Sequence, residues 1–139
     1  MGYTYFNCTA IDSFGVSSSC LFYVQIVDTE PPKITCPNNQ NVTTDPGKSY
    51  FTETATFENT LKGTITFSDN VDSSSVLAQT LVCIFPSSLN ASVSGLPQAY
   101  VINCTIHDSS YNYNSCAFSI TVEDKEPPTL TGIKIIHEI

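Results

Sequence analysis

The sequence predicts an all-β chain, and three of its features point to that class. Apolar and polar residues alternate with a period of two along several short segments, as they do in half-buried strands. Residues that favour turns, mainly Gly, Pro, Asn, Asp and Ser, separate these segments. No stretch carries a convincing helical period, so we expect no helix.

The clearest alternation lies in the segments AYVINCTIHD and SCAFSITVED, which a polar loop at 108–115 joins into a predicted hairpin. One face of the first segment holds Tyr100, Ile102, Cys104 and Ile106. One face of the second holds Cys116, Phe118, Ile120 and Val122. A similar hairpin is predicted at 5–27. There Phe6, Cys8 and Ala10 face Cys20, Phe22, Val24 and Ile26.

Other short segments complete the predicted fold. Strands are expected at 33–37, 40–44, 49–57, 63–68 and 76–85. Seven or so short strands in roughly 95 residues predict a β-sandwich of immunoglobulin type. The chain contains no tryptophan, so a true antibody-type domain is not expected.

The chain also repeats itself at an offset of 96 residues, which carries Asp28 onto Asp124. The pattern Asp-x-Glu-Pro-Pro occurs at 28–32 and again at 124–128, and the cysteine pair Cys8 and Cys20 recurs with the same spacing as Cys104 and Cys116. Pro-Pro restricts the backbone twice, so each copy predicts a short, stiff junction. We therefore expect the C-terminal hairpin of one repeat at 1–29, a complete repeat at 30–125 and the start of a further, divergent repeat at 126–139.

Composition excludes several classes of partner. The net charge is −8 and the five basic residues are all lysines, so we expect neither nucleic acid nor an anionic membrane as a partner. No apolar run approaches the roughly 18 residues that would span a bilayer, and membrane insertion is not expected. The start of the chain does not resemble a signal peptide. Because its other features are typical of secreted proteins, we expect an excerpt from a longer chain.

The cysteines and glycosylation sequons predict a secretory-pathway protein. The six cysteines include no Cys-x-x-Cys motif and the chain has two histidines, which argues against zinc and for disulfides. Disulfides form in oxidising compartments. Four Asn-x-Ser/Thr sequons are candidates for glycosylation, at Asn7, Asn41, Asn90 and Asn103. The expected location is extracellular or on the cell surface.

The motifs DTEPPKITCP, SDN and CTIHDSSYNYNSCAFSITVEDKEPP follow one another in an order that resembles the HYR module, or hyalin repeat. The resemblance implies an immunoglobulin-like extracellular module that occurs in tandem arrays in adhesive and matrix proteins, with neighbouring HYR repeats of the same longer chain as partners. Two departures stand out. Residues 108–112 read DSSYN where the family resembles DASGN, and Gly132 occupies the position equivalent to Cys36.

Two disulfide schemes remain open for the complete repeat. In an immunoglobulin-type sandwich, the first and last strands would bring Cys36 near Cys116, and neighbouring strands would bring Cys83 near Cys104. This scheme is favoured. The rival joins Cys104 to Cys116 across one hairpin. In the favoured scheme, Cys8 and Cys20 pair with each other or stay free.

An enzyme is not expected, because His107 is predicted to be a solvent-facing strand residue and His137 lies in the divergent tail. The predicted function is a non-catalytic adhesion or matrix spacer, one segment of a tandem-repeat rod. The alternative is a module that binds an extracellular glycan or protein receptor through the 108–115 loop, with Tyr111 and Tyr113 as candidate contacts.

Acidic residues in three separate segments are expected to meet at the start of the complete repeat. They belong to the first junction, to the SDNVD loop and to the hairpin loop. Oxygen-rich clusters suit Ca²⁺, which takes six to eight oxygen ligands. The candidate ligands are Asp28, Glu30, Asp69, Asn70, Asp72 and Asp108.

Overall fold

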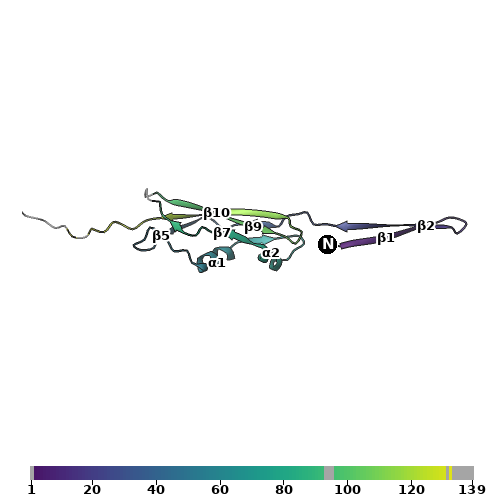
Figure 1. The fold of residues 1–139 in the computed structure, drawn as a ribbon, viewed down its shortest axis with the longest axis horizontal. Coiled ribbons are helices and arrows are strands. Elements are labelled where there is room, and N and C mark those ends of the chain that lie inside the picture. The colour runs from purple at the N-terminus through teal and green to yellow at the C-terminus, as the bar shows by residue number, and fades with distance from the viewer. Residues whose placement is uncertain (1, 93–95, 131, 133–139) are drawn as a thin grey trace, which may run out of the picture. The chain divides into compact units, whose positions relative to one another are not determined.

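The computed structural model describes the chain except residues 1, 93–95, 131 and 133–139. The described residues form ten strands and two short helices (Figure 1). The fold is therefore mostly β, as the sequence predicts. The expectation of no helix was wrong.

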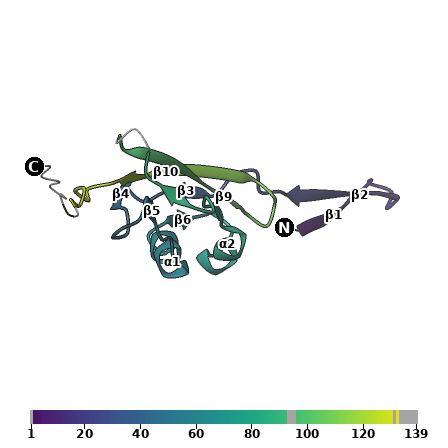
Figure 2. The same ribbon diagram turned by 60° about the vertical axis from the view of Figure 1, so that its left-hand side comes forward.

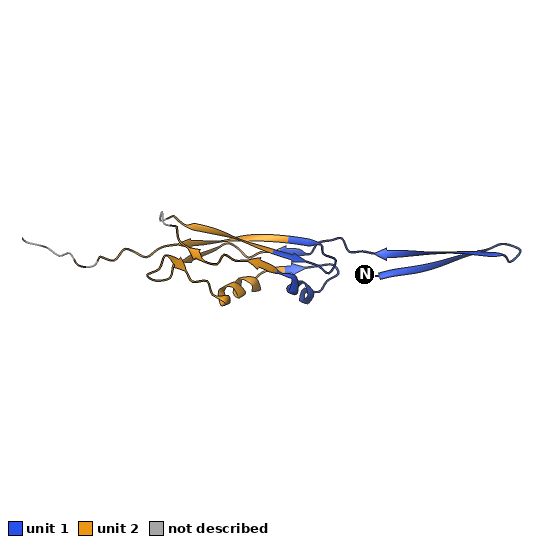
Figure 3. Cartoon of the chain, viewed as in Figure 1, with its two compact units in different colours: residues 1–34, 67–81, 105–114 blue, residues 35–66, 82–104, 115–139 orange. Residues whose placement is uncertain are grey.

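The chain divides into two compact units, coloured separately in Figure 3. Unit 1 comprises residues 1–34, 67–81 and 105–114, and unit 2 comprises residues 35–66, 82–104 and 115–139. The strands of the described residues are distributed over four sheets. The largest has the strand order β4 (Gln40–Thr43), β10 (Tyr113–Glu123), β9 (Gln98–His107) and β7 (Val82–Ile84).

The N-terminal hairpin of unit 1 has the predicted strands. β1 (Gly2–Ile11) pairs antiparallel with β2 (Ser17–Ile26), and the register places Cys8 directly opposite Cys20. Phe6 lies opposite Phe22, and their rings stack with centroids 5.2 Å apart. Every described residue of both strands is exposed, so this hairpin contributes nothing to a core.

In unit 2, β4 lies beside β10 (Figure 2). Their parallel pairing places Val42 opposite Val122. The predicted inward faces of β9 and β10 are confirmed by the alternating burial along both strands. Tyr100 is only half-buried, and its hydroxyl bonds to the backbone of Asn90. The core of unit 2 is formed by Leu61, Ile65, Leu89, Ile102, Cys104, Phe118, Ile120 and Val122.

Helix α1 (Ala55–Gly63) overlaps both predicted strands 49–57 and 63–68. The Thr54 hydroxyl accepts a hydrogen bond from the Phe57 amide at 3.2 Å and caps the first turn. Phe57 and Leu61 lie four residues apart and so share one helix face. Phe57 packs on Phe51 with ring centroids 5.2 Å apart, and Leu61 is buried. These contacts favour a helix. Of the two predicted strands, the short elements β5 (Tyr50–Phe51) and β6 (Thr66–Ser68) remain.

Helix α2 (Ser74–Thr80) occupies the first half of the predicted strand 76–85, and β7 occupies part of the second half. Ser73 precedes the helix with an extended backbone and accepts the amide of Leu77 at its carbonyl. Leu77 is fully buried. The remaining short strands are β3 (Lys33–Thr35), which pairs with β6, and β8 (Leu89–Asn90), which pairs with β5.

Two disulfides lie in unit 2, Cys36–Cys116 and Cys83–Cys104. They are the same two pairs as in the favoured scheme. Cys8 and Cys20 are free and exposed. Among the described residues, no helix is long and apolar enough to span a membrane.

Candidate functional site

The loop after β9 is organised around the carboxylate of Asp108, a fully buried residue. Its Oδ1 accepts hydrogen bonds from the amides of Ser110 and Asn112, each at 2.8 Å. Its Oδ2 accepts one from the Asn112 side chain, also at 2.8 Å. Asp side chains commonly close turns in this way, which explains why the strand ends here.

These bonds also set the protonation of Asp108. Burial acts to raise the pKa of its carboxyl, but the hydrogen bonds from Asn112 and Ser110, together with nearby His107, outweigh burial and hold the pKa below its ordinary value. Asp108 is therefore ionised at neutral pH. The loop thus holds a fixed, buried negative charge.

Asp28, in the first junction, is held against this loop. Its Oδ1 accepts a hydrogen bond from the Glu30 amide at 3.1 Å, and its backbone carbonyl accepts one from the Asn112 side chain at 3.2 Å. Further along, the Asn114 side chain donates to the Pro32 carbonyl at 2.8 Å. Two asparagines of the hairpin therefore fix the path of the junction.

Asp69 approaches from a third segment, directly after β6. Its Oδ2 accepts hydrogen bonds from the amides of Val71 and Asp72, both at 2.9 Å. The other oxygen, Oδ1, is buried and accepts no hydrogen bond. The same is true of Asp28 Oδ2.

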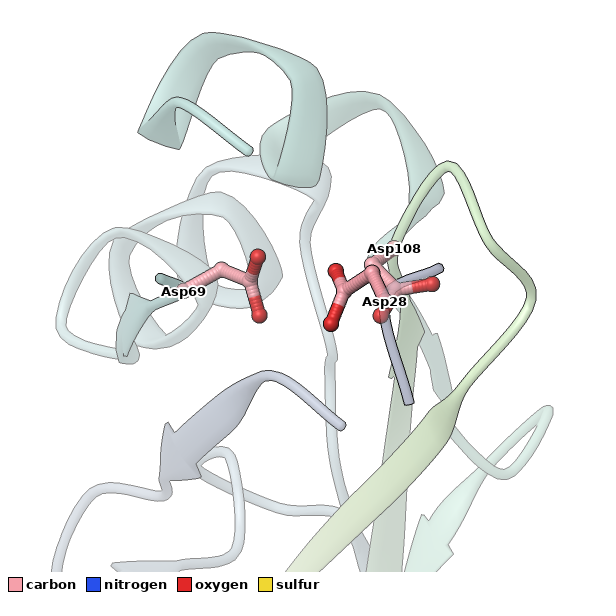
Figure 4. Close-up of side chains that lie close together, drawn as sticks. All are labelled: Asp28, Asp69 and Asp108. Carbon is pink, nitrogen blue, oxygen red and sulfur yellow. The ribbon is translucent and has the colours of Figure 1, made fainter. Parts of the chain in front are cut away.

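The three aspartates converge within unit 1. One carboxylate oxygen from each lies within 4.8 Å of the other two, and Figure 4 shows the Asp69 carboxylate pointing towards Asp28 and Asp108. Two like charges at such a distance repel by about 3–4 kcal/mol at an effective dielectric constant near 20. Unpaired buried acceptors and mutual repulsion would both be relieved by a bound cation. Oxygen ligands of this kind suit Ca²⁺.

The other predicted ligands are not part of this group of three aspartates. Asp72 accepts hydrogen bonds from the amide and the hydroxyl of Ser109. Glu30 and Asn70 bond to each other at 3.3 Å. Both residues line a pocket of about 140 Å³ that Asp69 also lines, so they lie next to the cluster.

Sequence reasoning missed the role of Asn112. Its side chain donates to both Asp108 and the Asp28 carbonyl and so joins two of the three segments. The 96-residue repeat could not reveal it, because the equivalent residue in the first hairpin is Val16. An Asn four residues after a loop Asp was the available signal.

Aromatic side chains surround His107 at the end of β9. The Tyr111 ring stacks on the imidazole with centroids 5.3 Å apart, and the Tyr113 ring lies at 5.1 Å. Tyr111 and Tyr113 are 70% and 64% exposed, so both predicted contact residues are accessible. His107 is half-buried rather than solvent-facing, and its Nδ1 lies 2.9 Å from the Asp108 carbonyl oxygen. His137 lies outside the described residues.

Tyr111 has a φ of 63°, in the region that favours glycine. Replacing Tyr111 by glycine should therefore give a more stable protein than replacing it by alanine, by roughly 1–2 kcal/mol. Both variants lose the ring on His107, so only the backbone term differs between them. Urea denaturation of the two variants measures this difference. A more stable alanine variant would contradict it.

The four candidate glycosylation residues are Asn7, Asn41, Asn90 and Asn103, and all four are exposed. Each lies in a strand. Their side chains are therefore accessible to a modifying enzyme.

Comparison with known proteins gives no further assignment. No protein-family model matches the chain, and neither a curated protein nor a solved structure does.

Proposed function

We propose that the chain is a non-catalytic structural module of an extracellular tandem-repeat protein, in which 30–125 is one complete repeat and each Asp-x-Glu-Pro-Pro is a junction. The proposed role is that of a spacer in an adhesive or matrix protein. The family that best accounts for the motifs is the HYR module. The observation that carries this proposal is that both copies of the repeated sequence adopt the same local geometry.

The two hairpin loops share the hydrogen bonds from backbone amides that close them. In the first, Asp12 Oδ1 accepts hydrogen bonds from the amides of residues 14 and 16, as Asp108 Oδ1 does from residues 110 and 112. Gly15 has a φ of 81°, and its equivalent Tyr111 has a φ of 63°. The two loops have similar backbone geometry although their sequences differ, which supports a common structural unit.

The two junctions agree as well. Asp28 Oδ1 accepts the Glu30 amide at 3.1 Å, and Asp124 Oδ1 accepts the Glu126 amide at 2.9 Å. Each junction therefore begins with the same turn, followed by two prolines that restrict the backbone. A recurring, restricted joint is what a spacer built from repeats requires.

The proposed fold of the complete repeat is an immunoglobulin-like sandwich. Supporting it are a four-stranded sheet whose central strands have one buried face, and buried residues of α1 and β8 in the same unit. The two disulfides and the exposed sequons support a glycoprotein of the secretory pathway.

A second proposed function is Ca²⁺ binding by Asp28, Asp69 and Asp108. The supporting observation is the pair of buried oxygens, Asp28 Oδ2 and Asp69 Oδ1, that accept no hydrogen bond beside an ionised Asp108. A bound ion would tie the junction to two loops of the repeat. The spacer would then be stiffened by calcium at the start of each repeat.

The alternative function, recognition of a glycan or a protein receptor by the 108–115 loop, is favoured by the exposed rings of Tyr111 and Tyr113. Aromatic side chains are common in binding sites. A spacer can carry such a loop, so the two functions are compatible.

Small-angle scattering tests the spacer. The full chain would be compared with versions in which residues 30–125 occur two and three times in succession. A rod predicts that the radius of gyration rises nearly in proportion to the number of repeats. A compact particle predicts an increase of only about 1.4-fold between one and three copies. The compact result would overturn the proposal.

A further inference from the structure

The inward face of the β1–β2 hairpin corresponds residue by residue to buried positions of β9 and β10. The 96-residue offset carries the six hairpin residues onto apolar residues in every case. In β1 the pairs are Phe6 with Ile102, Cys8 with Cys104 and Ala10 with Ile106. In β2 they are Phe22 with Phe118, Val24 with Ile120 and Ile26 with Val122.

Burial distinguishes the two hairpins sharply. Phe22, Val24 and Ile26 are 48%, 45% and 71% exposed, whereas their equivalents in β10 are at most 3% exposed. Side chains of this kind gain roughly 1.5–3 kcal/mol each when they are fully buried. The hairpin therefore exposes apolar side chains whose equivalents in β9 and β10 are buried.

The complete repeat shows what covers such a face. In unit 2, the other buried apolar side chains come from α1, β8 and Ile65, the Phe85 ring lies 6.4 Å from the Phe118 ring, and β4 and β7 flank the two strands in the sheet. All these elements lie between residues 30 and 97. The same segment supplies Cys36 and Cys83, the partners of Cys116 and Cys104.

We propose that the β1–β2 hairpin docks onto a segment equivalent to residues 30–97 of another repeat, supplied on its N-terminal side in the same polypeptide. Two disulfides would link the hairpin to this segment, one from Cys8 to the equivalent of Cys83 and one from Cys20 to the equivalent of Cys36. This inference rests on the proposed tandem-repeat function. It assigns the exposed thiols and the exposed apolar face to one partner.

A second molecule of this chain is a poor occupant. Its own segment 30–97 already covers β9 and β10, and its Cys36 and Cys83 are already in disulfides. Within a repeat, residue 97 leads directly into β9, so a segment on the N-terminal side has the connection that the fold uses.

Each new disulfide needs an oxidant. Two thiols lose two protons and two electrons, which a small-molecule disulfide such as oxidised glutathione accepts as it is cleaved to two thiols. The joined sulfurs then form one S–S bond for each oxidant molecule reduced.

The test is an extended chain in which a copy of residues 30–97 is joined directly to residue 2 of the otherwise complete chain. Both proteins would be refolded with reduced and oxidised glutathione, then denatured and alkylated. The natural chain should show two alkylated cysteines, whereas the extended chain, which has four cysteines outside the two existing disulfides, should show none. Peptide mapping should find Cys8 and Cys20 each bonded to a cysteine of the copy. Amide exchange over residues 3–26 should slow in the extended chain alone.

Matched variants of the extended chain separate docking from chance oxidation. Val24→Lys places a charge on the inward face and should abolish both new disulfides. Gln25→Lys, on the opposite face, should leave them intact. A Cys8–Cys20 bond, free thiols or unchanged exchange in the extended chain would overturn the inference. The scattering test lengthens the chain only with copies of residues 30–125, so it can succeed or fail independently.

Discussion

Replacing Cys36 and Cys116 together by alanine should lower the free energy of unfolding by about 4 kcal/mol. The two residues are separated by 80 positions, and the chain-entropy model assigns a loss of roughly that size to so long a loop. Alanine, unlike serine, adds no hydroxyl at these half-buried positions. Guanidinium denaturation under oxidising conditions would measure the change.

The comparison with Cys83 and Cys104 makes this expectation sharper. These residues are separated by 21 positions, so the same model predicts that replacing both by alanine lowers the free energy of unfolding by about 3 kcal/mol. Packing would predict the opposite order, because Cys104 is fully buried whereas Cys36 and Cys116 are not. A larger loss for the shorter loop would therefore show that packing dominates.

A third pair of substitutions serves as the control. Cys8 and Cys20 are exposed and free, so replacing both by alanine should change the free energy of unfolding by less than about 0.5 kcal/mol. A large loss in this variant would mean that the two thiols have a structural role in the isolated chain.

The hairpins could be predicted from the sequence because their alternation continues over about ten residues. The period of two then becomes distinct from the period of a helix. The helices could not. Leu77 and Leu81 are four residues apart, a spacing that fits one face of a strand and one face of a helix equally well. The residues that mark the helices are Thr54 before α1 and Ser73 before α2. A Thr or Ser at the start of a helix is a weak signal in a chain rich in both residues.

The candidate site was predictable in outline only. That three acidic segments meet follows from the positions of Asp28, Asp69 and Asp108 at the ends of strands and at the junction. Which carboxylates remain without partners does not follow, because it depends on side-chain bonds. Asp72 bonds to Ser109, whereas Asp69 leaves one oxygen without a partner.

Ca²⁺ at about 10 mM should raise the melting temperature of the protein by roughly 5–10 °C. Extracellular modules bind Ca²⁺ with dissociation constants on the order of 10⁻⁴–10⁻³ M. At about 10 mM Ca²⁺, a ligand of that affinity stabilises the folded state by about 1.4–2.7 kcal/mol. Mg²⁺ should stabilise less, because it demands near-octahedral geometry and gives up its water reluctantly.

The double variant Asp28→Asn with Asp69→Asn should abolish this gain and reverse the order of stability in a chelator. Without metal, the variant should melt above the natural protein, because two of the three carboxylates that repel one another are gone. With Ca²⁺, the natural protein should melt higher. The two melting temperatures therefore cross as Ca²⁺ is added, which a general effect of calcium on an acidic chain would not produce.

The repeat itself provides the matched control for this experiment. Asp12 and Asp124 are the equivalents of Asp108 and Asp28, and neither belongs to the cluster of Asp28, Asp69 and Asp108. The variant Asp12→Asn with Asp124→Asn loses the same net charge but should keep the full response to Ca²⁺. Scanning calorimetry of the three proteins in Ca²⁺, in Mg²⁺ and in chelator measures all of these melting temperatures. Equal melting temperatures of the natural protein in Ca²⁺ and in chelator would exclude calcium binding at the three aspartates.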